Sequence, residues 1–307
     1  MKVFVTGVCG QLGHDVMNEL AKRGYEGVGS DIQEAYAGVA DGTAVTTAPY
    51  VSLDITDQAA VEKVITEIHP DVIVHCAAWT AVDMAEDDDK VAKVRAINAG
   101  GTQNIANVAK AIDAKMVYIS TDYVFDGQGT EPWQPDCKEY KPLNVYGQTK
   151  LEGELAVSGT LDKYFIVRIA WVFGKNGKNF VKTMVNLAKT HDTLNVVNDQ
   201  LGNPTNAVDL AYHILKLAVS HDYGIYHCTG SGICSWYDFA SEIIRLSGLP
   251  CTVKPVTSAQ YKEMNPKSAD RPAWSALENR ALRCSVGDDM RDWKDAIQDF
   301  FNNWDGK

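Results

Sequence analysis

Short apolar runs alternate with helical patterns from the first residue of the chain. The runs are almost continuously apolar, as in residues 2–6, 71–75 (DVIVH), 116–120 (MVYIS) and 164–169 (YFIVRI). Strands of this kind are buried on both faces, and the intervening helices supply the cover. The sequence therefore predicts an α/β fold built on a doubly wound parallel sheet.

The remaining elements follow from the same periodicity. Further strands are expected at 25–30 and 51–53, and helices at 12–23, 57–68, 90–112 and around 150–157. Thr56 is expected to cap the helix at 57–68. Residues 33–50 have no clear period and are expected to form a loop.

The chain is expected to form two domains. Residues 1–170 would be the sheet domain, and residues 171–307, where the pattern becomes irregular, a smaller C-terminal α/β substrate lobe. Segments around 196–228 are expected to return to the first domain. A length of 307 residues is sufficient for both.

Composition narrows the classes of function. A formal charge of −11 argues against nucleic-acid binding, which needs a basic face. No apolar run is long enough to span a membrane. The seven scattered cysteines form no C-x-x-C pair, so we expect neither a metal site nor a disulfide framework. A reduced, cytoplasmic protein is the simplest interpretation.

A glycine-rich turn connects the first strand to the first helix. Its sequence GVCGQLG places Gly7, Gly10 and Gly13 in a G-x-x-G-x-x-G spacing. Glycines allow a tight turn and a close approach of the backbone to a pyrophosphate. The helix N-terminus beyond them, from Gln11 and Leu12, offers unpaired N–H groups. This predicts a Rossmann-type dinucleotide site, whereas a purely structural turn is the less favoured alternative.

Two acids follow the next predicted strands. Asp31 can accept hydrogen bonds from the adenosine ribose and would repel a 2′-phosphate, so it favours NADH over NADPH. A solvated loop acid is the other interpretation. Asp54 is a candidate for the adenine amino group, or equally an ordinary acid near a helix N-terminus.

A catalytic set is predicted from three residues. Tyr146 and Lys150 lie four residues apart on one helical face, and Thr121 follows a strand at the carboxyl edge of the sheet. A nearby ammonium is expected to lower the pKa of the tyrosine, which can then act as general acid toward a keto oxygen. Thr121 would hold that oxygen, and Lys150 would also bind the nicotinamide ribose.

These residues and their surroundings resemble the dTDP-4-dehydrorhamnose reductase family of the extended short-chain dehydrogenases/reductases. The resemblance covers most of residues 1–211 in order. It includes VTGVCGQLG at 5–13, HCAAWTAVDMAE at 75–86, YISTDYVFDG at 118–127, PLNVYGQTKLEGE at 142–154 and VVNDQLGNPTNAVDLA at 196–211.

The resemblance implies reduction of the 4-keto group of dTDP-4-dehydro-L-rhamnose by NADH or NADPH, in a monomer or homodimer. It makes Tyr146 the proton donor, with Lys150 and Thr121 assisting. The implied cofactor contacts are Gly7, Gly10, Gln11, Leu12, Gly13, Asp31, Asp54, Ile55, Ala77, Ala78, Thr80, Tyr146 and Lys150.

The sugar side is implied by fewer residues. Thr121, Asp122 and Trp171 match positions near the sugar, and Arg271 is a candidate for the diphosphate or the sugar. Trp171 can also be a core aromatic. Asn98 matches a helix-distorting asparagine, with an ordinary helical asparagine as the alternative.

Two segments depart from the family pattern. The acidic pair usual before the P-L-N segment is replaced by WQPDCK at 133–138, and an asparagine of the R-P-x-N-S-x-L segment is Trp274 here. A reductase or epimerase acting on another nucleotide sugar therefore stays open. So does a non-catalytic regulatory subunit of the same fold, which retention of the catalytic set disfavours.

Overall fold

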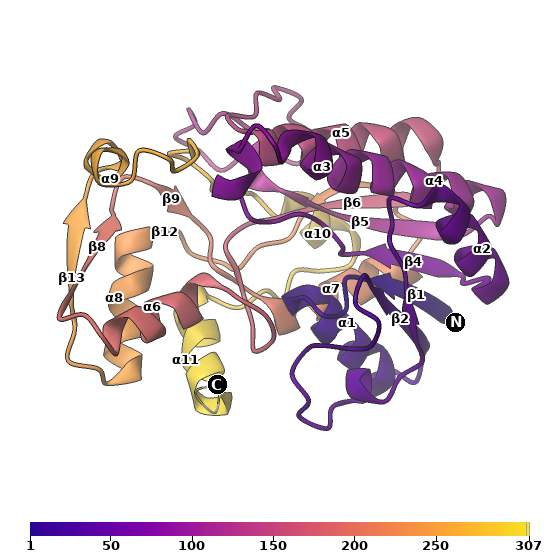
Figure 1. The fold of residues 1–307 in the computed structure, drawn as a ribbon, viewed down its shortest axis with the longest axis horizontal. Coiled ribbons are helices and arrows are strands. Elements are labelled where there is room, and N and C mark those ends of the chain that lie inside the picture. The colour runs from indigo at the N-terminus through magenta and orange to yellow at the C-terminus, as the bar shows by residue number, and fades with distance from the viewer. Residues whose placement is uncertain (305, 307) are drawn as a thin grey trace.

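The computed structural model describes residues 1–304 and residue 306. At its centre is a parallel seven-stranded sheet with the strand order β11-β6-β5-β4-β1-β2-β3 (Figure 1). Its strands are β1 (Lys2–Thr6), β2 (Glu26–Asp31), β3 (Tyr50–Ser52), β4 (Val72–His75), β5 (Lys115–Thr121), β6 (Tyr164–Ile169) and β11 (Gly224–His227). The predicted doubly wound parallel sheet is confirmed.

Helices cover both faces of the sheet. One face packs against α1 (Gln11–Lys22) and α7 (Ala207–Val219), whose apolar side chains form one core with β1, β4, β5 and β6. The other face packs against α2 (Gln58–Ile68), α4 (Thr102–Ala111) and α5 (Val145–Thr160). The strands are buried on both faces because each face contributes side chains to a separate core.

The strand order places a switch point between β1 and β4. From β1 the chain continues outward to β2 and β3, and then crosses back to β4 on the other side of β1. Loops following β1 and β4 therefore leave the sheet in opposite directions and open a crevice at its carboxyl edge. Open α/β sheets bind their ligands at such a point.

Three details differ from the sequence expectations. Asp57, not Thr56, caps α2, since its carboxylate accepts a hydrogen bond from the Ala60 N–H at 3.0 Å. The expected helix at 90–112 is divided into α3 (Val91–Arg95), a π-helical segment (Ala96–Gly101) and α4. The expected loop at 33–50 contains a short 3-10 helix, Ala44–Thr46.

A second group of elements lies beside the carboxyl edge of the sheet. Figure 1 shows α6 (Phe180–Ala188), α8 (Trp236–Ser247) and α11 (Trp293–Asn303) together with the paired strands β8 (Thr193–Val197) and β13 (Thr252–Val256). Their apolar side chains form a core of their own. The short pairs β7 (Val172–Phe173) with β10 (Thr205–Asn206), and β9 (Leu201–Gly202) with β12 (Cys234–Ser235), lie between this core and the sheet.

The chain crosses between the two cores more than once. After β10, helix α7 packs on α1, and β11 pairs with β6 at the edge of the sheet. The small helix α9 (Ser258–Met264) lies near β8, whereas α10 (Arg280–Ser285) contributes Leu282 to the sheet-side core. The division into two domains at residue 170 stays a prediction.

In the described part of the chain, no helix is long and apolar enough to cross a membrane.

Candidate active site

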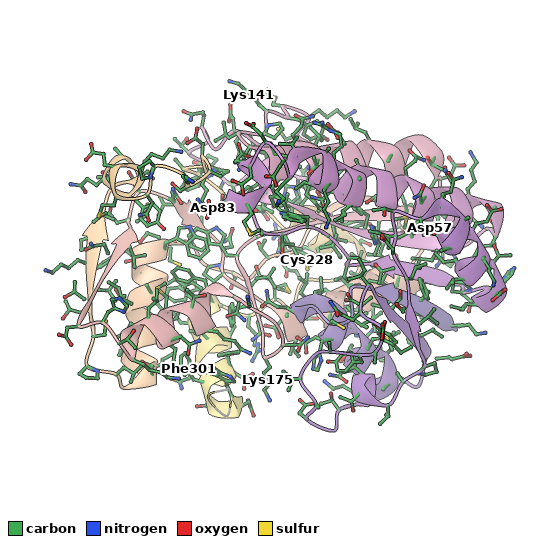
Figure 2. The ribbon with its side chains drawn as sticks, viewed as in Figure 1. Asp57, Asp83, Lys141, Lys175, Cys228 and Phe301 are labelled. Atoms are coloured by element: carbon green, nitrogen blue, oxygen red, sulfur yellow. The ribbon has the colours of Figure 1, made fainter. Side chains whose placement is uncertain are left out.

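A cavity of about 720 Å³ opens at the carboxyl edge of the sheet. Its walls come from the loops after β1, β2, β3, β4, β5 and β6, and from two segments near the second core, at Gly177 and Trp236. The volume lies within the range of small-molecule and cofactor sites. In Figure 2 the side chain of Lys175 extends near the boundary between the two cores.

The glycine turn fits a dinucleotide because it has no room for side chains. Gly7 has φ of 73°, and a Cβ atom there would lie 2.7 Å from the Ala77 backbone nitrogen. A Cβ atom on Gly13 would lie 2.3 Å from the Gly7 carbonyl oxygen. Glycine is therefore required at both positions. No side chain caps α1 at Gly10, so its first N–H groups can bind a phosphate.

Asp31 connects the end of β2 to the glycine turn. One carboxylate oxygen accepts the Cys9 N–H at 3.0 Å, and the other accepts the Ile32 N–H at 2.8 Å. The carboxylate lines the cavity. It therefore fixes the turn and also presents negative charge where the adenosine ribose is expected.

The other predicted cofactor residues also line the cavity. Asp54 accepts two hydrogen bonds from Thr56, so its carboxylate is fixed at the end of β3. The structure brings together, as predicted, Gly7, Gly10, Gln11, Leu12, Gly13, Asp31, Asp54, Ile55, Ala77, Ala78, Thr80, Tyr146 and Lys150. Their placement supports the predicted cofactor site, while their individual roles stay predictions.

Helix α5 carries Tyr146 and Lys150 into the cavity. Its N-terminus is fixed by Asn144, whose side chain accepts the Gly147 N–H at 2.8 Å and donates to the Asp270 carbonyl at 2.8 Å. Because the Asn144 side chain both accepts and donates a hydrogen bond, it attaches the first turn of α5 to the backbone at Asp270. Tyr146 lies in that turn and lines the cavity with Thr121.

The expectation that Lys150 lowers the pKa of Tyr146 is wrong in this structure. Burial of the phenol is the dominant influence and raises the pKa of Tyr146 to about 12. A hydrogen bond with Thr121 lowers it, and the charge of Asp122 raises it, both to a smaller degree. Burial wins because a phenolate loses more hydration than Thr121 can replace. Tyr146 is therefore protonated at neutral pH.

Lys150 is 3% exposed, and its ammonium lies 4.2 Å from the centre of the Tyr118 ring. Burial lowers the pKa of Lys150 to about 7, while the carboxylate of Glu154 opposes that change. A cation over an aromatic face gains attraction from the ring electrons. Near neutral pH the side chain is therefore divided between its charged and neutral forms.

Asp122 is a buried carboxylate with a free oxygen. It is 3% exposed and lines the cavity, and its Oδ1 accepts the Thr121 hydroxyl at 3.0 Å. Its Oδ2 has no hydrogen-bond partner. Burial raises the pKa of Asp122 to about 6, against smaller opposing influences of the nearby Ser275 and Thr121 hydroxyls. Because Oδ2 is itself buried, a ligand hydroxyl can bond to it only after a neighbouring side chain moves.

Trp171 and Trp236 form an aromatic wall. Their ring centres are 3.6 Å apart with an interplanar angle of 11°, and both line the cavity. Trp171 has φ of 48°, an uncommon value for a bulky residue. Gly202 allows this placement, because a Cβ there would lie 2.6 Å from the Trp171 ring. The sequence did not reveal Trp236, which belongs to no recognised motif.

Arg271 does not line the described cavity, although it was predicted to bind substrate. Its guanidinium pairs with Asp83 at 2.8 Å and bonds to the Ala269 carbonyl at 3.1 Å. It also lies beside Tyr123, whose ring is part of the cavity wall. Figure 2 shows Asp83 near the middle of the molecule, above Cys228 in that view. A substrate contact by Arg271 stays a prediction.

Asn98 lies within the π-helical segment, in agreement with the predicted distortion. Its Oδ1 accepts the Trp79 N–H at 2.8 Å, and its Nδ2 donates to the Trp79 carbonyl at 3.2 Å. The same Nδ2 donates to the Thr149 hydroxyl at 3.0 Å. Asn98 thus attaches the loop after β4 to helix α5 at Thr149, which lies between Tyr146 and Lys150 in the sequence.

The two segments that depart from the family pattern pack against each other. The Trp133 ring nitrogen donates to the Trp274 carbonyl at 3.2 Å, and Trp274 donates to the Glu131 carbonyl at 2.9 Å. Trp133 stacks on Phe125 with ring centres 4.5 Å apart. Neither tryptophan lines the described cavity. The two departures therefore form one paired packing change beside the site.

Asn176, which the sequence did not single out, ties the second core to the glycine turn. Its Nδ2 donates to the carbonyls of Cys9 at 2.9 Å and Gly10 at 2.8 Å. Its Oδ1 accepts the Val39 N–H at 2.7 Å. Three segments that are distant in the sequence are joined by the Asn176 amide, and Lys178, two residues later, lines the cavity.

Among the described residues, no group of histidines, cysteines and acids could hold a metal.

Comparison with known proteins places this site in a family. The family described as "RmlD substrate binding domain" matches residues 1–305. A curated relative from Streptomyces griseus, dTDP-4-dehydrorhamnose reductase, is 38% identical over 97% of this chain and 92% of its own length. The chain belongs to the dTDP-4-dehydrorhamnose reductase family. The resemblance predicted from sequence is confirmed, and with it an NAD(P)H-dependent oxidoreductase.

Solved structures of the dTDP-4-dehydrorhamnose reductase family have the same fold. The enzyme from Clostridium acetobutylicum is 44% identical, with a TM-score of 0.87 over 98% of this chain and 99% of its own. The Bacillus anthracis enzyme, solved in complex with NADP, is 37% identical, with a TM-score of 0.86 over 98% of each chain. A nicotinamide dinucleotide site in this chain agrees with that complex.

Proposed function

We propose that this protein reduces the 4-keto group of dTDP-4-dehydro-L-rhamnose, giving dTDP-L-rhamnose. The proposal rests on family membership together with one observation about the site. Thr121, Tyr146 and Lys150 meet in one cavity with the glycine turn, so a proton donor lies beside a dinucleotide site. Asp122 and the wall of Trp171 and Trp236 would then face the sugar.

Each residue has a definite task in this reaction. A nicotinamide dinucleotide bound at the glycine turn would supply the hydride that adds to the keto carbon. Hydride addition turns the carbonyl oxygen into an alkoxide, and Tyr146, protonated at neutral pH, gives its proton to that oxygen, so that a hydroxyl forms. The pKa of this hydroxyl lies near that of water. Because that value exceeds the pKa of about 12 for Tyr146, proton transfer is favourable. The ammonium of Lys150 would bind the nicotinamide ribose and stabilise the resulting phenolate.

Thr121 keeps the reacting oxygen in place in this proposal. Its hydroxyl has a single proton, which it donates to Asp122 in this structure. It can donate to a substrate oxygen only after that bond is exchanged. Asp122 lines the same part of the cavity, so a sugar hydroxyl that bonds to its carboxylate would lie beside Thr121.

We propose NADH as the preferred cofactor. Asp31 lies at the end of β2 with both oxygens fixed by backbone N–H groups, so it cannot easily turn away from a 2′-phosphate. The cations in the described lining are Lys150 and Lys178, and neither lies on β2 or in the loop that follows it. The Bacillus anthracis relative was solved with NADP, so the preference must be tested by comparing NADH with NADPH.

The decisive experiment follows NADH absorbance at 340 nm with dTDP-4-dehydro-L-rhamnose, and then with NADPH. We expect rapid oxidation with both cofactors and a higher kcat/KM for NADH. Cofactor binding without oxidation would contradict the proposed substrate. A panel of other keto-sugar nucleotides would then be tested. Oxidation with one of them would indicate a different sugar substrate, which the packing change at Trp133 and Trp274 would favour, and oxidation with none would indicate a non-catalytic protein.

A further inference from the structure

A fully buried ion pair joins the helix that carries Tyr146 and Lys150 to strand β6. Glu154 is 3% exposed and Arg168, on β6, is 0% exposed. The guanidinium Nε donates to Glu154 Oε1 at 2.8 Å, and Nη2 donates to Oε2 at 2.7 Å. Ser120, on β5, donates to Oε1 at 2.5 Å. Both carboxylate oxygens are therefore fixed in a single orientation.

Arg168 has further partners of its own. Nη2 donates to the Tyr140 hydroxyl at 2.9 Å, and Nη1 lies 3.4 Å from Nε2 of His227. Its carbon Cζ lies 5.1 Å from the centre of the Phe125 ring and 5.0 Å from that of Tyr140. The guanidinium is thus held from three directions. It places an opposite charge directly against the buried Glu154 carboxylate, which offsets the cost of removing both groups from water.

Glu154 follows Lys150 by four residues and therefore lies on the same face of α5. The other groups around the Lys150 ammonium are uncharged at neutral pH. They are Tyr118 on β5, His75 and Cys76 at the end of β4, and Tyr146 on α5 itself. Burial holds the pKa of His75 down at about 3, so that ring adds no charge. Among these neighbours of the Lys150 ammonium, Glu154 is the one that carries a carboxylate.

We propose that Glu154 is a positioning residue that keeps the Lys150 ammonium charged inside the active site. Arg168 and Ser120 hold the carboxylate, and the carboxylate acts on Lys150 through space. This inference rests on the proposed function, in which the charged Lys150 binds the nicotinamide ribose and supports Tyr146. It assigns a function to an ion pair that would otherwise serve only to join α5 to β6.

The direction of the effect follows from two opposing influences. Burial lowers the pKa of Lys150 to about 7, and Glu154 prevents a larger decrease. The ammonium is present below that pKa and lost above it. Without the carboxylate the pKa falls further, so Lys150 is neutral over more of the physiological range. Cofactor affinity and turnover should then both decline at a lower pH than in the unchanged protein.

The test compares Glu154→Gln with the unchanged protein across pH 5.5–9. Two quantities are measured: the Kd of NADH, from its fluorescence, and kcat/KM for NADH, which reports the free enzyme. We expect the alkaline midpoint of both profiles to move down by about one pH unit, and NADH binding at pH 8 to weaken by up to about tenfold. Ser120→Ala, which removes a bond to Glu154 without removing charge, should leave the midpoint in place.

Two further variants make the result unambiguous. Lys150→Met should abolish the alkaline limb, which assigns it to that lysine. If Glu154→Gln does not fold, Glu154→Gln with Arg168→Met removes both charges together, so that no unpaired charge stays buried. A uniform loss of affinity with an unchanged midpoint would overturn the proposal. Because NADH binding needs no sugar, a wrong substrate assignment leaves this test intact.

Discussion

The two ends of the cavity are built in different ways. At the cofactor end, backbone groups and small side chains come from loops directly after β1, β2, β3 and β4. At the sugar end, Asp122 follows β5, whereas Trp171 and Trp236 come from segments 65 positions apart, from the end of β6 and the start of α8. The cofactor end depends on glycines, which leave space for the ligand, whereas the sugar end depends on large side chains.

This difference has a physical origin. A diphosphate is bound by the unpaired N–H groups at a helix N-terminus, which any helix offers whatever its side chains, so the main requirement is space. A sugar nucleotide must be distinguished from others of similar size. That requires an apolar surface of definite shape and a few fixed hydrogen-bonding groups. Substitutions should therefore damage cofactor binding at one end and substrate recognition at the other.

The largest effect should come where the two ends meet. Tyr146→Phe removes the proton donor while the ring still fills its place, so kcat should fall by about 10²–10⁴-fold. The Kd of NADH, measured by fluorescence, should change little. Tyr123→Phe is a matched control, because this neighbouring ring contacts Tyr146 edge to face at 5.6 Å. Equal losses in both variants would contradict the donor assignment.

Gly7→Ala should break the cofactor end alone. The new methyl group would lie 2.7 Å from the Ala77 nitrogen, at a backbone φ of 73° that alanine rarely adopts. We expect NADH affinity to fall by more than about tenfold, as measured by isothermal titration. Gly24→Ala is the control for backbone strain, since φ there is 70° but no atom lies within 4 Å. Similar losses in both variants would show that strain, not space, is decisive.

Trp236→Ala should affect the sugar end alone. Loss of the ring that stacks on Trp171 opens the wall, so KM for the sugar nucleotide should rise by roughly five- to tenfold. The Kd of NADH should stay within about twofold, because the cofactor loops are untouched. Trp133→Phe, outside the described cavity lining, is the control. A change confined to NADH affinity would reverse the assignment of the two ends.

The smallest effect should come from Asp31→Asn. The amide oxygen can still accept the Cys9 N–H, but the negative charge that opposes a 2′-phosphate is gone. The ratio of kcat/KM for NADPH over NADH should rise by about three- to tenfold. Initial rates with the two cofactors measure it. An unchanged ratio would mean that Asp31 acts only on the glycine turn.

Much of the cofactor end could be predicted from sequence because its signals are local. Gly7 and Gly13 lie within one turn, and that turn lies between a strand and a helix whose periodicities are both visible. Tyr146 and Lys150 lie on one helix, so their relative placement follows from helix geometry. Only small boundary errors occurred, such as Thr56 in place of Asp57 as a cap.

The rest could not be predicted because it depends on contacts between distant segments. The substrate contact of Arg271 stays a prediction, whereas its ion pair with Asp83, 188 positions away, had no signal in the sequence. Asn176 and Trp236 carry no motif and reach the site only through the packing of the second core. The pKa of Tyr146 was predicted in the wrong direction, since burial around the phenol outweighs the adjacent charge.

The sequence by itself determined the parallel sheet, the glycine turn and the order of the catalytic residues along one strand end and one helix. These depend on periodicity and on spacing within a few residues. The tertiary structure decided which charges are paired, which carboxylate oxygen is free, and how far each pKa moves. Those properties depend on removal of water and on neighbours from β6, α8 and the segment at Asn176, which no local pattern encodes.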